Sequence, residues 1–173
     1  MEFWPSLAAI IILLLGLLIL VWHSAIDLKL RLLPDELTIA LAVLGLLFHW
    51  AAYPFSGAWL DVLMGAAIGG GALALVRAVA NHLYGFETMG LGDVKLLAAF
   101  GIWLGAEGVL FALMAGALAG VVHGIGLLLY ARTKSKDHPG FREMTVPAGP
   151  GFCVGALIVA TWQYHATLPL FGG

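Results

Sequence analysis

Long stretches without an ionisable residue are the feature that most limits what this 173-residue chain can fold into. A helix needs about 20 residues to cross the hydrocarbon core of a membrane. These residues must be mainly apolar, because an ionised group in hydrocarbon costs several kcal/mol. The sequence therefore predicts an all-α membrane protein with short loops, a single integral-membrane domain over residues 1–173. We expect it to be a bundle of six transmembrane helices, at about residues 4–26, 36–54, 60–82, 91–106, 108–130 and 149–167.

Composition supports lipid as the main solvent of the chain. Apolar residues make up 62% of it and charged residues 10%, with a mean hydropathy of +1.01, whereas soluble domains are near a quarter charged. The net charge of −2 offers no basic surface for nucleic acid. One cysteine, Cys153, and six scattered histidines predict no disulfide, no metal site and no cofactor.

The basic residues predict how the helices are oriented. Lys and Arg favour the cytoplasmic side of short loops, and with six spans all eight of them fall on one side of the membrane. We therefore expect the loops 1–2, 3–4 and 5–6 in the cytoplasm and both termini outside. The first span follows Glu2 rather than a positively charged segment, so we interpret it as a retained helix and not as a secretion signal.

Two of the ten acidic residues stand out. Asp35 and its neighbour Glu36 follow Pro34, which is how a helix ordinarily opens. Asp27, in contrast, ends the apolar first span, and Asp93 follows two glycines directly before a helix. In the predicted topology both lie at the inner boundary of the membrane, so their carboxyl groups can meet.

Such a pair has a specific chemistry. Two carboxyl groups a few ångströms apart cannot both ionise readily, so they share one proton. The ionised member can activate a water while the protonated member polarises a carbonyl group. His23 lies four residues before Asp27 on the same helix face, where it could contact that carboxylate.

Three ordered blocks of sequence resemble the type IV prepilin peptidases, which belong to the GxGD-type intramembrane aspartyl proteases. The first pairs Ile26-Asp27 with Pro34-Asp35 and Leu37-Thr38. The second is the segment Glu87-Thr88-Met89-Gly90-Leu91-Gly92-Asp93-Val94-Lys95. The third is Val146-Pro147-Ala148-Gly149-Pro150, before the last span.

The resemblance implies a function and a site. It implies an endopeptidase of a prokaryotic inner membrane that removes the leader of prepilin-like precursors, on the cytoplasmic side of their apolar helix, for type IV pili or secretion. Asp27 and Asp93 would be catalytic. Supporting or substrate-binding roles would fall to Gly90, Gly92, Glu87, Lys95, Pro34 and Pro147. Paired Cys-x-x-Cys motifs, which larger members associate with methyl transfer, do not occur, so we expect the short, peptidase-only form.

Two other classes of function remain open at this point. Intramembrane carboxylates also mark proton or cation pathways in transporters. Against this class, the two aspartates lie at one membrane face, and no continuous polar stripe crosses a span. A non-catalytic assembly subunit would need neither aspartate. Neither the precursor that is cleaved nor the oligomeric state can be predicted from this sequence.

Overall fold

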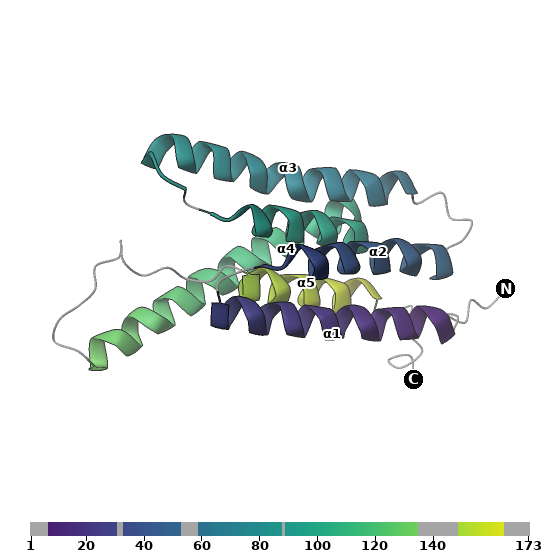
Figure 1. The fold of residues 1–173 in the computed structure, drawn as a ribbon, viewed down its shortest axis with the longest axis horizontal. Coiled ribbons are helices and arrows are strands. Elements are labelled where there is room, and N and C mark those ends of the chain that lie inside the picture. Colours follow the sequence, from purple (N-terminus) through teal and green to yellow (C-terminus); the bar gives the residue numbers. More distant parts are fainter. Residues whose placement is uncertain (1–6, 31–32, 53–58, 88, 135–148, 165–173) are drawn as a thin grey trace.

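The computed structural model describes residues 7–30, 33–52, 59–87, 89–134 and 149–164. These residues form helices and contain no strand, which confirms the predicted all-helical class. The helices are α1 (Leu7–Leu30), α2 (Asp35–Ala52), α3 (Trp59–Tyr84), α4 (Leu91–Lys134) and α5 (Gly149–Tyr164) (Figure 1).

Four stretches are long and apolar enough to cross a membrane. They are α1, α2, α3 and the Leu91–Gly126 part of α4. The outer surface carries large apolar side chains, among them Leu18, Trp22 and Leu63, each about 60% exposed. In water this surface would be very unfavourable, whereas lipid solvates it well.

The buried side chains of each helix lie on one face. On α1 they are spaced by three, four or seven residues, which is one stripe of a 3.6-residue helix: Ala9, Gly16, Leu20, His23 and Asp27. On α2 the same spacing selects Thr38, Leu41, Gly45, Phe48 and Ala52. These stripes pack against α4 and α5, whose Phe100 and Phe152 belong to the shared apolar core.

Glycines allow the helices to pack backbone against backbone. Gly65 of α3 lies against Gly101 of α4, where a β-carbon on either residue would collide with the backbone of the other. Between α4 and α5, a β-carbon on Gly151 would lie 2.8 Å from the Gly116 carbonyl oxygen. This close approach is how small-residue repeats bring helices together in lipid. Gly65 and Gly69, four residues apart on α3, both lie against α4 in this way.

The long helix α4 is broken at Gly105. This residue has φ 72° and ψ −176°, a conformation that residues other than glycine rarely adopt. Leu97, before the break, and Val109, after it, both lie against Gly69 of α3. The chain therefore turns back at Gly105, and the teal and green halves of α4 run in opposite directions (Figure 1).

Polar groups from other helices bind the backbone freed by this break. The Ala106 N–H donates to Asp61 Oδ1 at 3.1 Å. The Trp103 carbonyl accepts a hydrogen bond from the Tyr164 hydroxyl and lies 3.3 Å from His49 Nε2. A backbone break inside a membrane is tolerated where such partners exist.

The helix count differs from the expectation of six. The described residues form five helices, because the expected spans 91–106 and 108–130 belong to the broken helix α4. At the first span, α1 continues to Leu30, so Asp27 lies inside its last turn and does not end it.

Candidate active site

One end of the bundle collects the sequence-predicted site residues. The last turn of α1 and the first turns of α2, α4 and α5 meet there (Figure 1). Asp27 comes from α1 and Asp93 from α4, and their exposed fractions are only 4% and 7%. The structure thus buries both carboxyl groups at the same end of the molecule.

The two carboxyl groups share one neighbourhood. Asp27 contributes directly to the electrostatic environment of Asp93. Cys153, in the second turn of α5, lies near enough to both carboxyl groups to interact with them electrostatically. Helices α1, α4 and α5 therefore bring two buried acidic side chains into one region of the bundle.

Asp27 is held by the beginning of α5. The backbone N–H of Gly149 donates a hydrogen bond of 3.1 Å to Asp27 Oδ2. A helix N-terminus carries partial positive charge and favours a negative group. A side chain at position 149 would bring its β-carbon within 2.5 Å of the same oxygen, so this contact requires glycine. Pro150, which follows, has no N–H to offer.

Asp93 is less constrained. It lies in the first turn of α4, and a β-carbon on Gly90 would be 3.8 Å from Asp93 Oδ2. Its other oxygen, Oδ1, is buried and has no hydrogen-bond partner within the described part of the chain. Buried carboxylate oxygens are normally paired, so this atom is available for a water or a substrate group.

Two ion pairs hold the segments around Asp93. Lys95 Nζ lies 2.8 and 2.7 Å from the two carboxylate oxygens of Asp35, which ties the start of α4 to the start of α2. Arg77 of α3 contacts Glu87 at 2.9 Å and donates to the Met89 carbonyl at 2.8 Å. The segment before Asp93 is therefore anchored to α3.

The other predicted supports have packing roles. The Pro34 carbonyl accepts hydrogen bonds from the N–H and the hydroxyl of Thr38, both at 3.3 Å, in the first turn of α2. Gly92 leaves room for Leu33, which would be 2.7 Å from a β-carbon there. Pro147 lies outside the described residues.

Sequence reasoning missed three of the residues that shape the site. From the sequence, Asp35 has a place at a helix start and in the first block, Gly149 has a place in the third block, and Arg77 counts only among the eight basic residues. The Gly149-Pro150 step was the available signal for the contact with Asp27. No comparable signal linked Arg77 to the segment that it anchors.

His23 makes no hydrogen bond to Asp27, a contact that the four-residue spacing would allow. Its side chain is 0% exposed, on the same face of α1 as Asp27. No hydrogen bond joins the two, and neither ring nitrogen has a hydrogen-bond partner among the residues that the structure describes.

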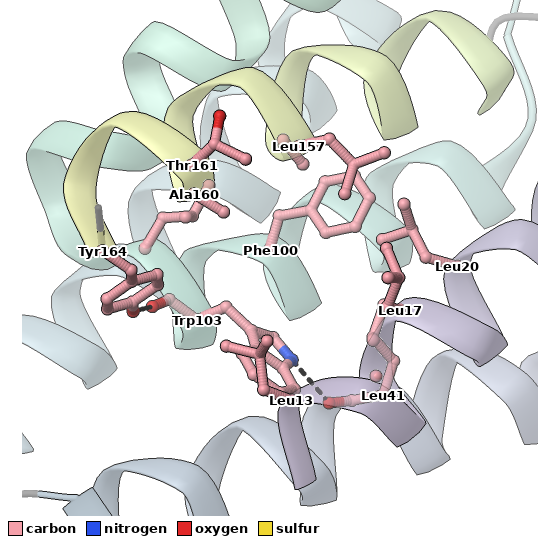
Figure 2. Close-up of a pocket in the computed structure, with 13 residues that line it drawn as sticks. Leu13, Leu17, Leu20, Leu41, Phe100, Trp103, Leu157, Ala160, Thr161 and Tyr164 are labelled. Atoms are coloured by element: carbon pink, nitrogen blue, oxygen red, sulfur yellow. Dashed lines mark hydrogen bonds between the residues drawn. The ribbon is translucent and has the colours of Figure 1, made fainter. Parts of the chain in front are cut away.

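An apolar cavity of about 180 Å³ lies farther into the bundle (Figure 2). Side chains of α1, α2, α4 and α5 line it, from Leu13 and Leu20 to Phe100 and Leu157. The Trp103 indole N–H donates to the Leu41 carbonyl, so it is already engaged. The cavity therefore offers apolar contact, whereas the acid chemistry lies at the end of the bundle.

Comparisons with known proteins give the family. The sequence model of the Type IV leader peptidase family matches residues 9–125, which include both aspartates. Proteins named prepilin leader peptidase/N-methyltransferase are 36% identical over 148 residues in Xanthomonas campestris and 36% over 160 residues in Aeromonas salmonicida. The one in Pectobacterium carotovorum is 40% identical over 125 residues.

These matches cover much of the chain but less of the relatives. They include 83%, 92% and 70% of this chain, and 47%, 50% and 40% of the respective relatives. The chain thus spans about half the length of the first curated relatives that it matches. No solved structure gives a significant match. On the family match and these identities, the chain belongs to the type IV leader peptidase family.

Proposed function

We propose that this protein is an aspartyl endopeptidase that removes the leader from type IV prepilin-like precursors. The observation that carries the proposal is the pair of buried carboxyl groups, Asp27 and Asp93, which interact at one end of an apolar bundle. The names of the relatives supply the substrate class. A pair of carboxyl groups that share a proton is the catalytic group of aspartic proteases.

The surroundings of the two groups suggest a division of roles. Asp27 receives the Gly149 N–H at the N-terminus of α5, which favours its ionised form. Within the described residues, Asp93 has one oxygen without a hydrogen-bond partner and no ion pair, which suits the protonated form. Asp27 is then the general base, and Asp93 is the acid that polarises the scissile carbonyl group.

The reaction follows in two steps. Asp27 takes a proton from water as the water oxygen bonds to the carbonyl carbon, and Asp93 gives its proton to the carbonyl oxygen. In the second step Asp27 gives its proton to the leaving nitrogen, the C–N bond breaks, and Asp93 regains its proton from the former carbonyl oxygen. Both carboxyl groups return to their starting states.

We also propose six membrane crossings. The Leu91–Gly126 stretch of 36 residues would be about 54 Å long as a straight helix, against a hydrocarbon core of about 30 Å. The reversal at Gly105 divides it into two crossings. Lys29 and Lys95 lie at the site end of the bundle, whereas Asp61 and Glu107 lie at the far end. This end would therefore face the cytoplasm of a bacterial inner membrane, with both termini outside.

The transport alternative gains no support from the described residues. The two aspartates lie at one end, and the cavity farther into the bundle exposes only apolar surface. A proton pathway needs polar groups or water along its length. We also propose that these 173 residues do not methylate the product, since they hold one cysteine and no Cys-x-x-Cys pair.

Cleavage of a purified precursor in detergent or liposomes tests the proposal. We expect a product that lacks the leader, seen by mass spectrometry, and no product with Asp27→Asn or Asp93→Asn. The matched control is Glu107→Gln, which neutralises an exposed acid at the far end and should cleave normally. Full cleavage by either aspartate variant, or proton flux without cleavage by the unmodified protein, would overturn the proposal.

A further inference from the structure

His23 is a buried polar side chain without an assigned task. It is 0% exposed, and neither ring nitrogen has a hydrogen-bond partner in the described part of the chain. A neutral imidazole has one donor and one acceptor, and leaving both unpaired in an apolar surrounding is costly. A leucine would fill the same space without this cost, so packing alone does not account for a histidine here.

The position of His23 relates it to the site without tying it to Asp27. The two side chains lie on the same buried face of α1, four residues apart, yet no hydrogen bond or ion pair joins them. Because a helix rises about 1.5 Å per residue, His23 lies about 6 Å farther into the bundle. The next residue of this face, Leu20, borders the apolar cavity.

A precursor cut by the proposed function needs partners at this depth. Its peptide backbone must leave the helical form around the scissile bond to reach the two aspartates, and its apolar helix continues into the membrane. Unwound backbone at membrane depth has no water to bind, so the enzyme must supply hydrogen bonds. An extended chain advances about 3.3 Å per residue, so 6 Å corresponds to about two residues.

We propose that His23 is a substrate-binding residue that hydrogen-bonds the backbone of the precursor about two residues beyond the scissile bond, on the side of its apolar helix. The inference rests on the proposed peptidase function. One imidazole can accept from a backbone N–H and donate to a backbone carbonyl group, and neither nitrogen of His23 has a partner among the described residues.

Steady-state kinetics with the full chain and a purified precursor tests this role. For His23→Leu we expect KM to rise about tenfold, the size of one lost hydrogen bond, with kcat within twofold of wild type. Thermal stability should stay equal or increase, because an unpaired polar group is removed. His23→Gln, which keeps a donor and an acceptor, should bring KM most of the way back to the wild-type value. The control His123→Leu changes an exposed histidine and should leave both constants unchanged.

Changing the substrate keeps the test independent of how well a variant folds. A precursor with an ester in place of the peptide bond two residues beyond the cut lacks one N–H and has a weaker acceptor. We expect this ester to raise KM with wild-type enzyme and to have little further effect with His23→Leu. Additive effects of ester and substitution would show that the two groups do not touch.

The outcomes separate this inference from the proposed function. If wild-type protein cleaves, Asp27→Asn does not, and His23→Leu has an unchanged KM, only the role of His23 is overturned. A loss confined to kcat also overturns it, since that would place His23 with the reacting groups. Cleavage that survives in Asp27→Asn overturns the peptidase mechanism itself.

Discussion

Polar groups at the two ends of the bundle have different surroundings. At the far end, the break at Gly105 frees backbone groups, and side chains of three other helices bind them. The Trp103 carbonyl receives the Tyr164 hydroxyl, and Asp61 accepts the Ala106 N–H. Such contacts are the usual way in which membrane proteins stabilise a helix break: other helices provide hydrogen-bond partners for the backbone groups that lose theirs.

At the site end, polar atoms are buried without partners. Asp93 Oδ1 and both ring nitrogens of His23 have none among the described residues. Asp93 Oδ1 and the two nitrogens of His23 are therefore candidates for contact with a substrate or a water.

Substitution of Asp93 should have the largest effect and should act on activity alone. We expect Asp93→Asn to lower kcat/KM at least about 10³-fold, as is usual when one member of a catalytic pair is lost. Thermal unfolding in detergent should stay the same or move to higher temperature, since a buried acid with an unpaired oxygen is replaced by a neutral group of the same shape.

Opposite behaviour would erase the contrast between the two ends. If Asp93→Asn unfolds the protein while the remaining folded fraction cleaves normally, the aspartate has the kind of structural role seen at the far end. Activity should therefore be expressed per folded molecule, with the folded fraction measured by size-exclusion chromatography.

Gly149→Ala should have the second largest effect. The added methyl group would meet Asp27 Oδ2 at about 2.5 Å and displace either the carboxylate or the start of α5. We expect kcat to fall about 10- to 100-fold with a smaller change in KM, because misplacement of a catalytic group by an ångström has costs of this order. Gly71→Ala is the matched control, since open space surrounds a β-carbon there. Equal kinetics for both alanine variants would show that Gly149 does not position Asp27.

Much of this arrangement could be predicted from the sequence. Charge-free runs gave the all-helical membrane class, because hydrocarbon accepts few other patterns. The isolation of Asp27 and Asp93 in apolar or glycine-rich sequence singled them out, and the structure buries them at one end. Both inferences depend on local residue types, which a sequence displays directly.

The contacts between distant segments could not be predicted. The N–H that Gly149 gives to Asp27 depends on how α5 enters the bundle. The anchoring of Met89 by Arg77 depends likewise on the packing of α3 beside α4. The possible contact of His23 with Asp27 is not a hydrogen bond, because four-residue spacing brings two Cβ atoms near each other without fixing where the side chains point.

Asp61→Ala should lower stability and leave activity nearly unchanged, the reverse of what we expect for Asp93→Asn, and its effect should be of intermediate size. It removes the acceptor of the Ala106 N–H, a cap for the second half of α4. Caps of this kind contribute about 1 kcal/mol, so we expect the unfolding temperature in detergent to fall while kcat/KM per folded molecule stays within about twofold. Asp61→Asn keeps an acceptor oxygen and should recover most of the stability. A loss of activity equal to that of Asp93→Asn would mean that the far end takes part in catalysis.

The ion pair between Lys95 and Asp35 should give the smallest effect, although it lies close to Asp93. Its side chains are 51% and 55% exposed, so water and salt screen the attraction. Exposed pairs contribute about 0.2–1 kcal/mol. A double-mutant cycle with Lys95→Met and Asp35→Asn should give a coupling energy in this range that shrinks as salt is added, with kcat changed less than about threefold. A kcat loss near that of Gly149→Ala would instead indicate that Lys95 sets the position of Asp93. The exposed ion pair would then belong to the active site.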